Sequence, residues 1–451
     1  IKNIIVDVYR QHRYLNKEDC FTENEKQQMM EITEKMDDVT AQDALKNLSS
    51  YLKLLYGKKV LIFLDEYDTP MQEAYINGYW DEFTGFMRGL FNATFKTNPY
   101  LERAIMTGIT RASKESVFSD LNNLTVITTT SDQYADCFGF TEEEVFKTLD
   151  QFGMSDKKQI VKQWYDGFSF GPFKDIYNPW SITNYLKEKK LRPYWASTSS
   201  NGLISKLLQS ASANMKTQLE ELLNGKQIIV NFDEQIIFGQ LEQDENAVWS
   251  LLVASGYLKV EEIEYKGMTL EPWYHLAVTN LETISMFSNM FKGWFATASA
   301  NYNEFIKAML VGNVKAMNLY MNDIALATFS SFDVGKHFSQ RSQPERFYHG
   351  FVLGLLVEVR DLYEIRSNRE SGYGRYDVML IPKTKENDGI ILEFKVKESE
   401  EKTLEETVQT ALAQIESKKY DAELLELGVS KEHIRHYGFA FEGKKVLIGQ
   451  K

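Results

Sequence analysis

Cysteine is scarce in this sequence: Cys20 and Cys137 are the only two among 451 residues, beside six histidines. No set of Cys and His ligands at metal-binding spacing is present, which excludes a structural zinc site. Few cysteines are typical of proteins in a reducing compartment, so we expect a cytoplasmic protein. No apolar run approaches the roughly 18 residues that a membrane-spanning helix needs, and we expect no contact with a membrane.

An excess of positive charge is also missing. The 51 Lys and Arg are outnumbered by 64 Asp and Glu, and the formal net charge is −13. Proteins that coat nucleic acid are usually basic, so the charge of the whole chain disfavours that class. An acidic enzyme can still cut nucleic acid when basic residues cluster locally around a metal.

The residues that are present describe a globular protein, with 43% hydrophobic, 25% charged and 13% aromatic residues. A chain of this length exceeds one hydrophobic core, so we expect about two to four domains. The sequence starts Ile1-Lys2-Asn3, without a signal peptide and without Met. We therefore expect it to begin inside a longer gene product.

Residues 1–140 have the pattern of an α/β domain. Apolar residues recur at helical spacing through residues 1–55. Two mostly apolar runs follow at 59–64 and 103–108, with a helical segment at 80–95 between them. A strand, a helix and a second strand predict a parallel sheet.

Residues 141–340 predict a mainly helical middle region. It contains a turn-rich insert at 165–171, and a helix closed by Gly256 that is followed by two alternating segments. Helix followed by hairpin is the outline of a winged-helix module, so we expect a winged-helix-like fold there. The expected elements are helices over 142–225, 248–258 and 283–340, and hairpin strands at 260–265 and 274–278.

Residues 341–451 predict a compact α/β domain of about 110 residues, which is large enough to fold alone. A helix, three strands, a second helix and a final pair of strands follow one another. The expected bounds are 345–358 and 403–419 for the helices, and 363–366, 375–381, 389–396, 436–441 and 445–448 for the strands.

Three charged residues interrupt the apolar strands of this last domain. Glu393 and Lys395 are two apart, so they face the same side of a strand, and a hairpin could bring Asp377 beside them. Carboxylate oxygens bind hard cations such as Mg²⁺ or Mn²⁺, and an ammonium can stabilise charge that grows on a phosphate. A solvated strand face would give the same spacing, but the apolar flanks of both strands favour a site.

The segments Gly374-Arg375-Tyr376-Asp377 and Leu392-Glu393-Phe394-Lys395, with the helix around Gln414, resemble the core of the PD-(D/E)XK nuclease superfamily. The resemblance implies a restriction-endonuclease-like fold and metal-dependent cleavage of DNA or RNA phosphodiesters. In this reading Asp377 and Glu393 are metal ligands, and Lys395 is the base or the charge stabiliser. Glu345, on the preceding helix, and Gln414 are further residues that the resemblance adds to the site.

A second acidic pattern ends the first apolar run of the chain. Residues 61–64 lead directly into Asp65 and Glu66, which is the form of a Walker B strand. Strands that end in acids are frequent, so the pattern alone is weak. The next strand ends in Thr107-Gly108-Ile109-Thr110-Arg111, at the sheet edge where parallel sheets bind ligands.

With Trp164-Tyr165-Asp166-Gly167 and Tyr177-Asn178-Pro179-Trp180, these residues resemble an AAA-ATPase-like family of bacterial proteins that carries such a nuclease. The resemblance implies that Asp65 and Glu66 serve Mg²⁺ and hydrolysis, that Thr107 or Thr110 acts as a sensor, and that Arg111 lies near the phosphates. The Gly-rich phosphate loop that holds ATP is absent from these 451 residues. Either the chain is truncated or the ATPase is degenerate, and we do not expect ATP hydrolysis from these residues alone.

The sequence thus predicts an α/β protein with a partial P-loop-type parallel sheet, a helical and winged-helix-like middle, and a C-terminal α/β domain. The expected function is that of a metal-dependent nuclease coupled to an AAA-like module, with nucleic acid as the partner. Self-association is compatible with the sequence. Two alternatives stay open: a non-catalytic switch that binds nucleic acid or protein, and an ATPase when an upstream phosphate loop is present.

Overall fold

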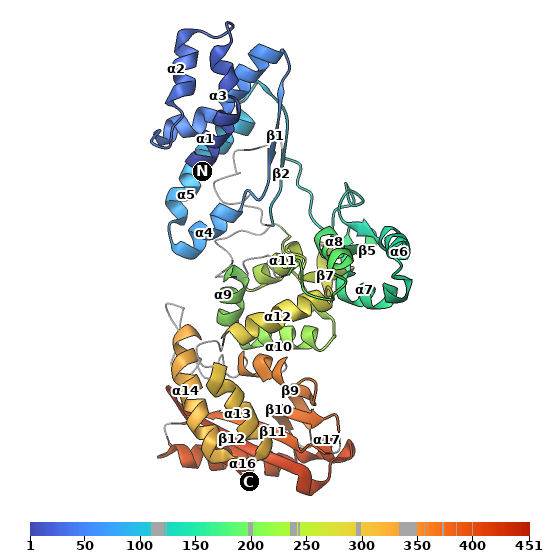
Figure 1. The fold of residues 1–451 in the computed structure, drawn as a ribbon. Helices are drawn as coiled ribbons and strands as arrows, with labels where there is room; N and C mark the ends of the chain where they lie inside the picture. The colour runs from blue at the N-terminus through green and yellow to red at the C-terminus, as the bar shows by residue number, and fades with distance from the viewer. Residues whose placement is uncertain are drawn as a thin grey trace.

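The structure is a computed structural model that describes residues 1–109, 121, 124–196, 202–234, 241, 244–294, 299–332, 350–355, 357–371, 374–384, 386–398 and 400–451. The molecule is elongated and of mixed α/β type (Figure 1). N-terminal helices lie at one end, the C-terminal sheet lies at the other, and a mainly helical region lies between them. No described helix combines the length and the apolar character that crossing a membrane requires.

Three helices open the chain, as the apolar spacing predicts, and a two-stranded sheet follows them. The side chains of Thr22 and Asp37 accept backbone hydrogen bonds at the starts of α2 and α3, and Gly57, with φ of 69°, ends α3. The elements are α1 (Lys2–Gln11), η1 (Arg13–Lys17), α2 (Glu23–Glu31), α3 (Asp38–Tyr56), β1 (Val60–Leu64), α4 (Thr69–Asn77), α5 (Trp80–Phe91), η2 (Asn92–Lys96) and β2 (Leu101–Met106).

The two strands pair in parallel, which confirms the predicted strand–helix–strand order. β2 begins and ends two residues earlier than predicted, because Leu101 is already paired with Val60. Leu61, Phe63 and Ile105 point away from the helices and are 57%, 71% and 52% exposed. Parallel sheets are usually covered on both faces, whereas the described part of this chain covers only one face of β1–β2.

The middle region is mainly helical, and its turn-rich insert is a β-hairpin, β4–β5, rather than an open turn. Phe168 and Phe170 are two apart, which is the period of a strand, and Gly171 turns the chain with φ of 50°. The elements are β3 (Phe140–Thr141), α6 (Glu142–Gln151), η3 (Ser155–Lys157), α7 (Lys158–Tyr165), β4 (Phe168–Phe170), β5 (Phe173–Tyr177), α8 (Pro179–Glu188), α9 (Gly202–Ser210), α10 (Ala213–Leu223), β6 (Ile228–Val230), α11 (Asn246–Ala254), β7 (Leu258–Lys266), β8 (Glu271–Val278), α12 (Leu281–Trp294), α13 (Ser299–Val311) and α14 (Val314–Phe332).

The expected helix and hairpin are present as α11 and β7–β8, and β6 adds a third strand that the sequence did not predict. In winged-helix proteins that bind DNA, a helix enters the groove with one face free. Residues 247–253 of α11 are all buried. This helix therefore serves the core of the middle region and offers no free face to a nucleic acid.

The C-terminal region forms a five-stranded mixed sheet in the order β13-β12-β11-β10-β9, with β11 and β12 parallel and the other pairs antiparallel. Met379 and Ile391 face α16 and α17, whereas Leu380 and Leu392 belong to the core formed with α13, α14 and helical residues near 351–355. The elements are β9 (Tyr363–Ser371), β10 (Gly374–Pro382), β11 (Gly389–Val396), α16 (Leu404–Lys418), α17 (Asp421–Glu426), η6 (Lys431–His433), β12 (Ile434–Glu442) and β13 (Lys445–Gln450).

Helix α14 closes the outer edge of this sheet with two asparagines one turn apart. Asn318 donates to the carbonyl of Ile448 at 2.8 Å and accepts from its amide at 2.8 Å. Asn322 makes the same reciprocal pair with Val446, at 2.8 and 3.0 Å. The two side-chain amides thus satisfy the outward backbone groups of β13, which would otherwise be an open strand edge.

Candidate functional site

The acidic residues of the C-terminal sheet lie where β10 and β11 separate. The two strands pair from Leu380 and Ile390 to Val378 and Leu392. One residue further on, the carboxylate of Asp377 accepts a hydrogen bond from the backbone amide of Phe394 at 2.7 Å. The Asp377 side chain therefore continues the link between the strands at the point where their backbones diverge.

Glu393 is the most buried acid of this group, with 2% of its surface exposed. Its Oε1 accepts a hydrogen bond from Nε2 of Gln414 on α16, and the same nitrogen donates to the hydroxyl of Tyr420 at 3.1 Å. Its Oε2 is buried and meets no hydrogen-bond donor among the described residues. A buried carboxylate oxygen without a donor is costly, which marks this atom as one that a ligand could satisfy.

Burial and a neighbouring charge both act on Glu393. Burial, the larger cause, and the negative charge of Asp377 raise the pKa of Glu393 to about 8. The positive charge of Lys395 and the backbone amide of Asp377 oppose this rise. The site therefore holds more negative charge than its protein surroundings compensate, and either a proton or a cation would relieve it.

Lys395 follows the alternation that the sequence predicts. Phe394 points to the other face of the sheet, where its ring stacks on Phe439 at 4.5 Å between centroids. Glu393 and Lys395, two apart, then share the face covered by α16, and the charge of Lys395 acts on Glu393. Two carboxylates and an ammonium thus converge beneath one helix.

The donor set fits a hard cation that keeps part of its water. Mg²⁺ commonly takes one or two carboxylates and completes its shell with water and substrate phosphate. Asp377 and Glu393 supply two carboxylates, and the unpartnered Oε2 of Glu393 is a free oxygen ligand. Within the described ranges no group of three or more His, Cys, Asp or Glu gathers at metal-binding distance, so an all-protein metal cage is not available there.

The acids at the end of β1 have a different environment. Asp65 and Glu66 are exposed, and the hydroxyl of Thr107, at the end of β2, donates to Asp65. The backbone amide of Glu66 also donates to Thr107 Oγ1 at 3.2 Å, and Glu66 has an unusual φ of 49°. Thr110 and Arg111 lie outside the described residues.

The buried acid beside this site is Asp68, three residues after Asp65. It is 2% exposed, and its Oδ2 accepts the backbone amide of Ile109 at 3.0 Å. A Cβ added at Gly108 would lie 2.6 Å from Asp68 Oδ1, so this position accepts only glycine without rearrangement. Asp68 therefore ties the ends of β1 and β2 together, and the sequence did not distinguish it from its exposed neighbours.

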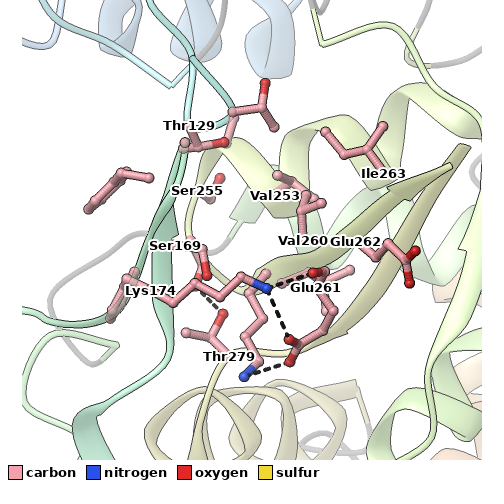
Figure 2. A pocket seen from close by; sticks show the side chains of 18 residues that line it. Thr129, Ser169, Lys174, Val253, Ser255, Val260, Glu261, Glu262, Ile263 and Thr279 are labelled. Carbon is pink, nitrogen blue, oxygen red and sulfur yellow. Dashed lines mark hydrogen bonds and ion pairs between the residues drawn. The ribbon is translucent and has the colours of Figure 1, made fainter. Parts of the chain in front are cut away.

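A pocket of about 340 Å³ lies in the middle region (Figure 2). Three of its four charged residues are paired with one another: Lys174 donates to the Glu261 carbonyl at 2.6 Å, and Lys259 contacts the Glu261 carboxylate at 2.8 Å. Ser169 and Thr279 add hydroxyls to the wall. None of the sequence-predicted site residues lines this pocket, and its mixed lining identifies no ligand class.

Comparison with protein families identifies both ends of the chain. Residues 343–451 match the PD-(D/E)XK nuclease superfamily, and residues 8–118 match a family described as predicted AAA-ATPase. The chain joins an AAA-ATPase-like domain to a PD-(D/E)XK nuclease superfamily domain.

One relative among curated proteins is an uncharacterized protein in the vnfD 5′ region of Azotobacter chroococcum mcd 1. It is 26% identical over 227 residues, which cover 50% of this chain and 41% of the relative. The match thus spans less than half of the relative's length. No solved structure matches the chain.

In the nuclease-superfamily domain, the structure brings Asp377, Glu393 and Gln414 together by hydrogen bonds and by charge, and Lys395 joins them through its charge. Glu345 lies outside the described residues.

The sequence reasoning predicted Gln414 but missed two threonines on the same helix. Thr407 and Thr410 precede Gln414 at helical spacing of three and four residues, so the three lie along one side of α16. The two threonines hold the carboxylate of Glu401. Their helical spacing from Gln414 is the sequence signal that could have found them.

Proposed function

We propose that the protein is a nuclease that hydrolyses phosphodiester bonds of DNA or RNA with Mg²⁺ or Mn²⁺. The observation that carries this proposal is Glu393, a buried carboxylate with an unpartnered oxygen beside the second carboxylate of Asp377. A nuclease-superfamily domain at the same residues supports the choice of a phosphodiester as substrate.

Asp377 and Glu393 would hold the metal, and the backbone carbonyl of Phe394 would be a third ligand. Bound there, the metal would lower the pKa of a water and offset charge on the phosphate. Lys395 would orient the attacking water or stabilise the negative charge that develops on the phosphate oxygens. In the reaction, water attacks phosphorus, the P–O bond to the leaving oxygen breaks, and that oxygen takes up a proton.

Gln414 would keep the Glu393 carboxylate in one orientation. It donates to Glu393 Oε1 and to the Tyr420 hydroxyl, so its amide is held from two sides. Oε2 of Glu393 would then be the oxygen left for a cation. A fixed ligand orientation is what partners behind a metal site usually provide.

The test is cleavage of single-stranded and duplex DNA and RNA by the full chain with Mg²⁺, with Mn²⁺ and with EDTA. We expect cleavage that needs the metal and that falls at least about a hundredfold in Glu393→Gln and in Lys395→Met. Glu386→Gln, an exposed glutamate in the loop between β10 and β11, is the matched control and should cleave like the wild type.

Wild-type cleavage that survives EDTA, or that survives both substitutions, would contradict the proposal. Tight nucleic-acid binding without any turnover would instead support the non-catalytic alternative. Circular dichroism of each variant shows whether a loss of cleavage reflects a loss of fold.

The AAA-ATPase-like domain would then act as a module coupled to the nuclease. The Thr107–Asp65 hydrogen bond supports a role of Asp65 in holding the Mg²⁺ of a nucleotide, with Glu66 beside it to polarise water. Because the sequence holds no phosphate loop, we propose no hydrolysis of ATP by these 451 residues.

A further inference from the structure

Glu401 is a carboxylate with a defined position beside the proposed nuclease site. It lies in the segment between β11 and α16. Its Oε2 accepts the Thr407 hydroxyl at 2.7 Å and the backbone amide of Glu398 at 3.0 Å, and its Oε1 accepts the Thr410 hydroxyl at 3.1 Å. Both oxygens are therefore held by hydrogen bonds.

The helix that holds Glu401 is the one that holds Glu393. Thr407, Thr410 and Gln414 lie on one face of α16, and Gln414 binds Glu393 while the threonines bind Glu401. One rigid element thus places two carboxylates at a constant separation along its axis.

Lys395 lies on the part of β11 that runs from Glu393 toward the segment that contains Glu401. It follows Glu393 by two residues on the same face of β11, and its charge acts on Glu393 and on Glu401. Among the described residues, Lys395 forms no close ion pair with either of them. Its ammonium is therefore attracted by both carboxylates without being neutralised by direct contact, which leaves its hydrogens available to a substrate.

We propose that Glu401 is a positioning residue that holds the Lys395 ammonium toward the phosphate in the nuclease reaction. This inference rests on the proposed nuclease function. Glu401 itself touches neither metal nor substrate in this scheme, and it acts only through Lys395. Without it, the long Lys395 side chain would be drawn toward the Asp377–Glu393 pair, where it would compete with the metal.

The charge state of Glu401 supports this role. The amide of Glu398 is the largest cause that lowers the pKa of Glu401, and the Thr407 and Thr410 hydroxyls and the charge of Lys395 act in the same direction. Glu401 therefore remains an anion under the neutral conditions in which a nuclease works.

The experiment is a double-mutant cycle with the full chain, Mg²⁺ and an activated phosphodiester, bis(p-nitrophenyl) phosphate, whose good leaving group keeps weak variants measurable. We expect Glu401→Gln to lower kcat about tenfold while KM changes less than about twofold, the size usual for a residue behind the site. Glu405→Gln, which removes the same charge from an exposed position on the first turn of α16, should leave kcat unchanged.

The second half of the cycle tests whether Glu401 acts through Lys395 or only supports the fold. In a Lys395→Met background, Glu401→Gln should cause no further loss, because it has no ammonium left to position. Glu401→Asp, which keeps the charge, should recover part of the lost kcat.

The inference is overturned if Glu401→Gln is as active as the wild type, or if its loss is the same in both backgrounds. The proposed function fails in a different way, since the wild type would then not cleave, or Glu393→Gln would cleave like the wild type. Wild-type cleavage that depends on Glu393 and Lys395 but not on Glu401 would leave the nuclease standing and remove only the inference.

Discussion

The two sheets at opposite ends of the molecule place their acids in contrasting environments. Asp65 and Glu66 follow β1 in a two-stranded sheet with one uncovered face, and both are exposed. Glu393 lies inside β11 of a five-stranded sheet with helices on both faces, and it is 2% exposed. In the sequence, the Asp65–Glu66 pair and Glu393 each follow a run of apolar strand residues.

The contrast shows that a sequence pattern of apolar strand residues followed by acids does not by itself determine how buried or how charged the surroundings of those acids are. Glu393 has a raised pKa because the sheet is covered and because Asp377 lies on the adjacent strand. Asp65 keeps access to water, which screens its charge and lowers the gain from binding a cation. Whether helices cover both faces of a sheet thus decides whether its acids lose contact with water and need a proton or a cation to balance their charge.

The largest expected effect comes from making the same Leu→Ala replacement in the covered sheet and in the uncovered sheet. Leu392 is fully buried in β11, whereas Leu61 is 57% exposed in β1. We expect Leu392→Ala to lower the free energy of unfolding by about 2–5 kcal/mol, through lost burial and a cavity. Leu61→Ala should change it by less than about 0.5 kcal/mol. Urea denaturation with hydrogen-exchange mass spectrometry of both strands measures the two values.

An equal loss in the two variants would break this comparison, because Leu61 would then have to be covered in solution. A small loss in Leu392→Ala would show that the C-terminal sheet repacks easily.

The second prediction asks whether a buried acid outside the nuclease domain affects stability without affecting nuclease activity. Asp166, in the middle region, is 7% exposed and lies 3.6 Å from Lys162 Nζ. Burial, a hydrogen bond with Asp175 and the charge of Asp175 raise the pKa of Asp166 to about 7, while Lys162 opposes the rise. Asp166 is thus a strongly perturbed carboxyl group outside the nuclease domain.

The sign of its pH dependence follows from the raised pKa. Between about pH 4, where the unfolded carboxyl loses its proton, and pH 7, the folded protein keeps a proton that the unfolded chain has lost. Stability therefore falls as pH rises through this window and stays constant above it, by at most about 4 kcal/mol. Asp166→Asn should abolish this fall and make the region more stable at pH 8, without changing nuclease activity.

Hydrogen-exchange protection of α7 at pH 5 and pH 8, corrected for the intrinsic exchange rate, measures this effect. Asp156→Asn, an exposed aspartate in the same region, is the control and should keep the wild-type pH dependence. A variant Asp166→Asn with the wild-type pH dependence would contradict the burial argument. Lost nuclease activity in that variant would connect the middle region to the site.

The smallest expected effect concerns the edge of the C-terminal sheet. Asn318→Ala and Asn322→Ala each remove a reciprocal pair of hydrogen bonds to β13. We expect each to lower the free energy of unfolding by about 1 kcal/mol, since water replaces part of what is lost. Asn184→Ala, whose amide bonds only its own helix at Trp180, is the control and should have a smaller effect.

Thermal unfolding followed by circular dichroism compares the three variants, and light scattering detects association through the opened edge. Equal effects at Asn318 and Asn184 would mean that the asparagines of α14 do not protect β13.

Most element types in the C-terminal domain could be predicted from the sequence, because their period of apolar residues is clear. The alternation around Glu393 and Lys395 predicted their common face, and the apolar stripe of the following helix predicted α16. The bounds of β9 were too short, and α17 was missed, because it has only six residues and no long apolar period.

The middle region was harder to predict. The turn-rich insert at 165–171 did not predict the hairpin β4–β5, because its strands have only three and five residues. The buried state of α11 could not be predicted either, since the sequence of a mostly apolar helix does not show whether one of its faces stays free for a ligand.

The sequence by itself determined which residues could form a metal site, because strand alternation and the Asp377…Glu393–Lys395 order are local properties of the chain. Only the tertiary structure decided their environment. The divergence of β10 and β11, the cover of α16 and the unpartnered oxygen of Glu393 all depend on contacts between segments far apart in sequence. Burial and charge act through space, so the acids of one sheet became a buried carboxylate beside a partly buried one, and those of the other sheet stayed exposed.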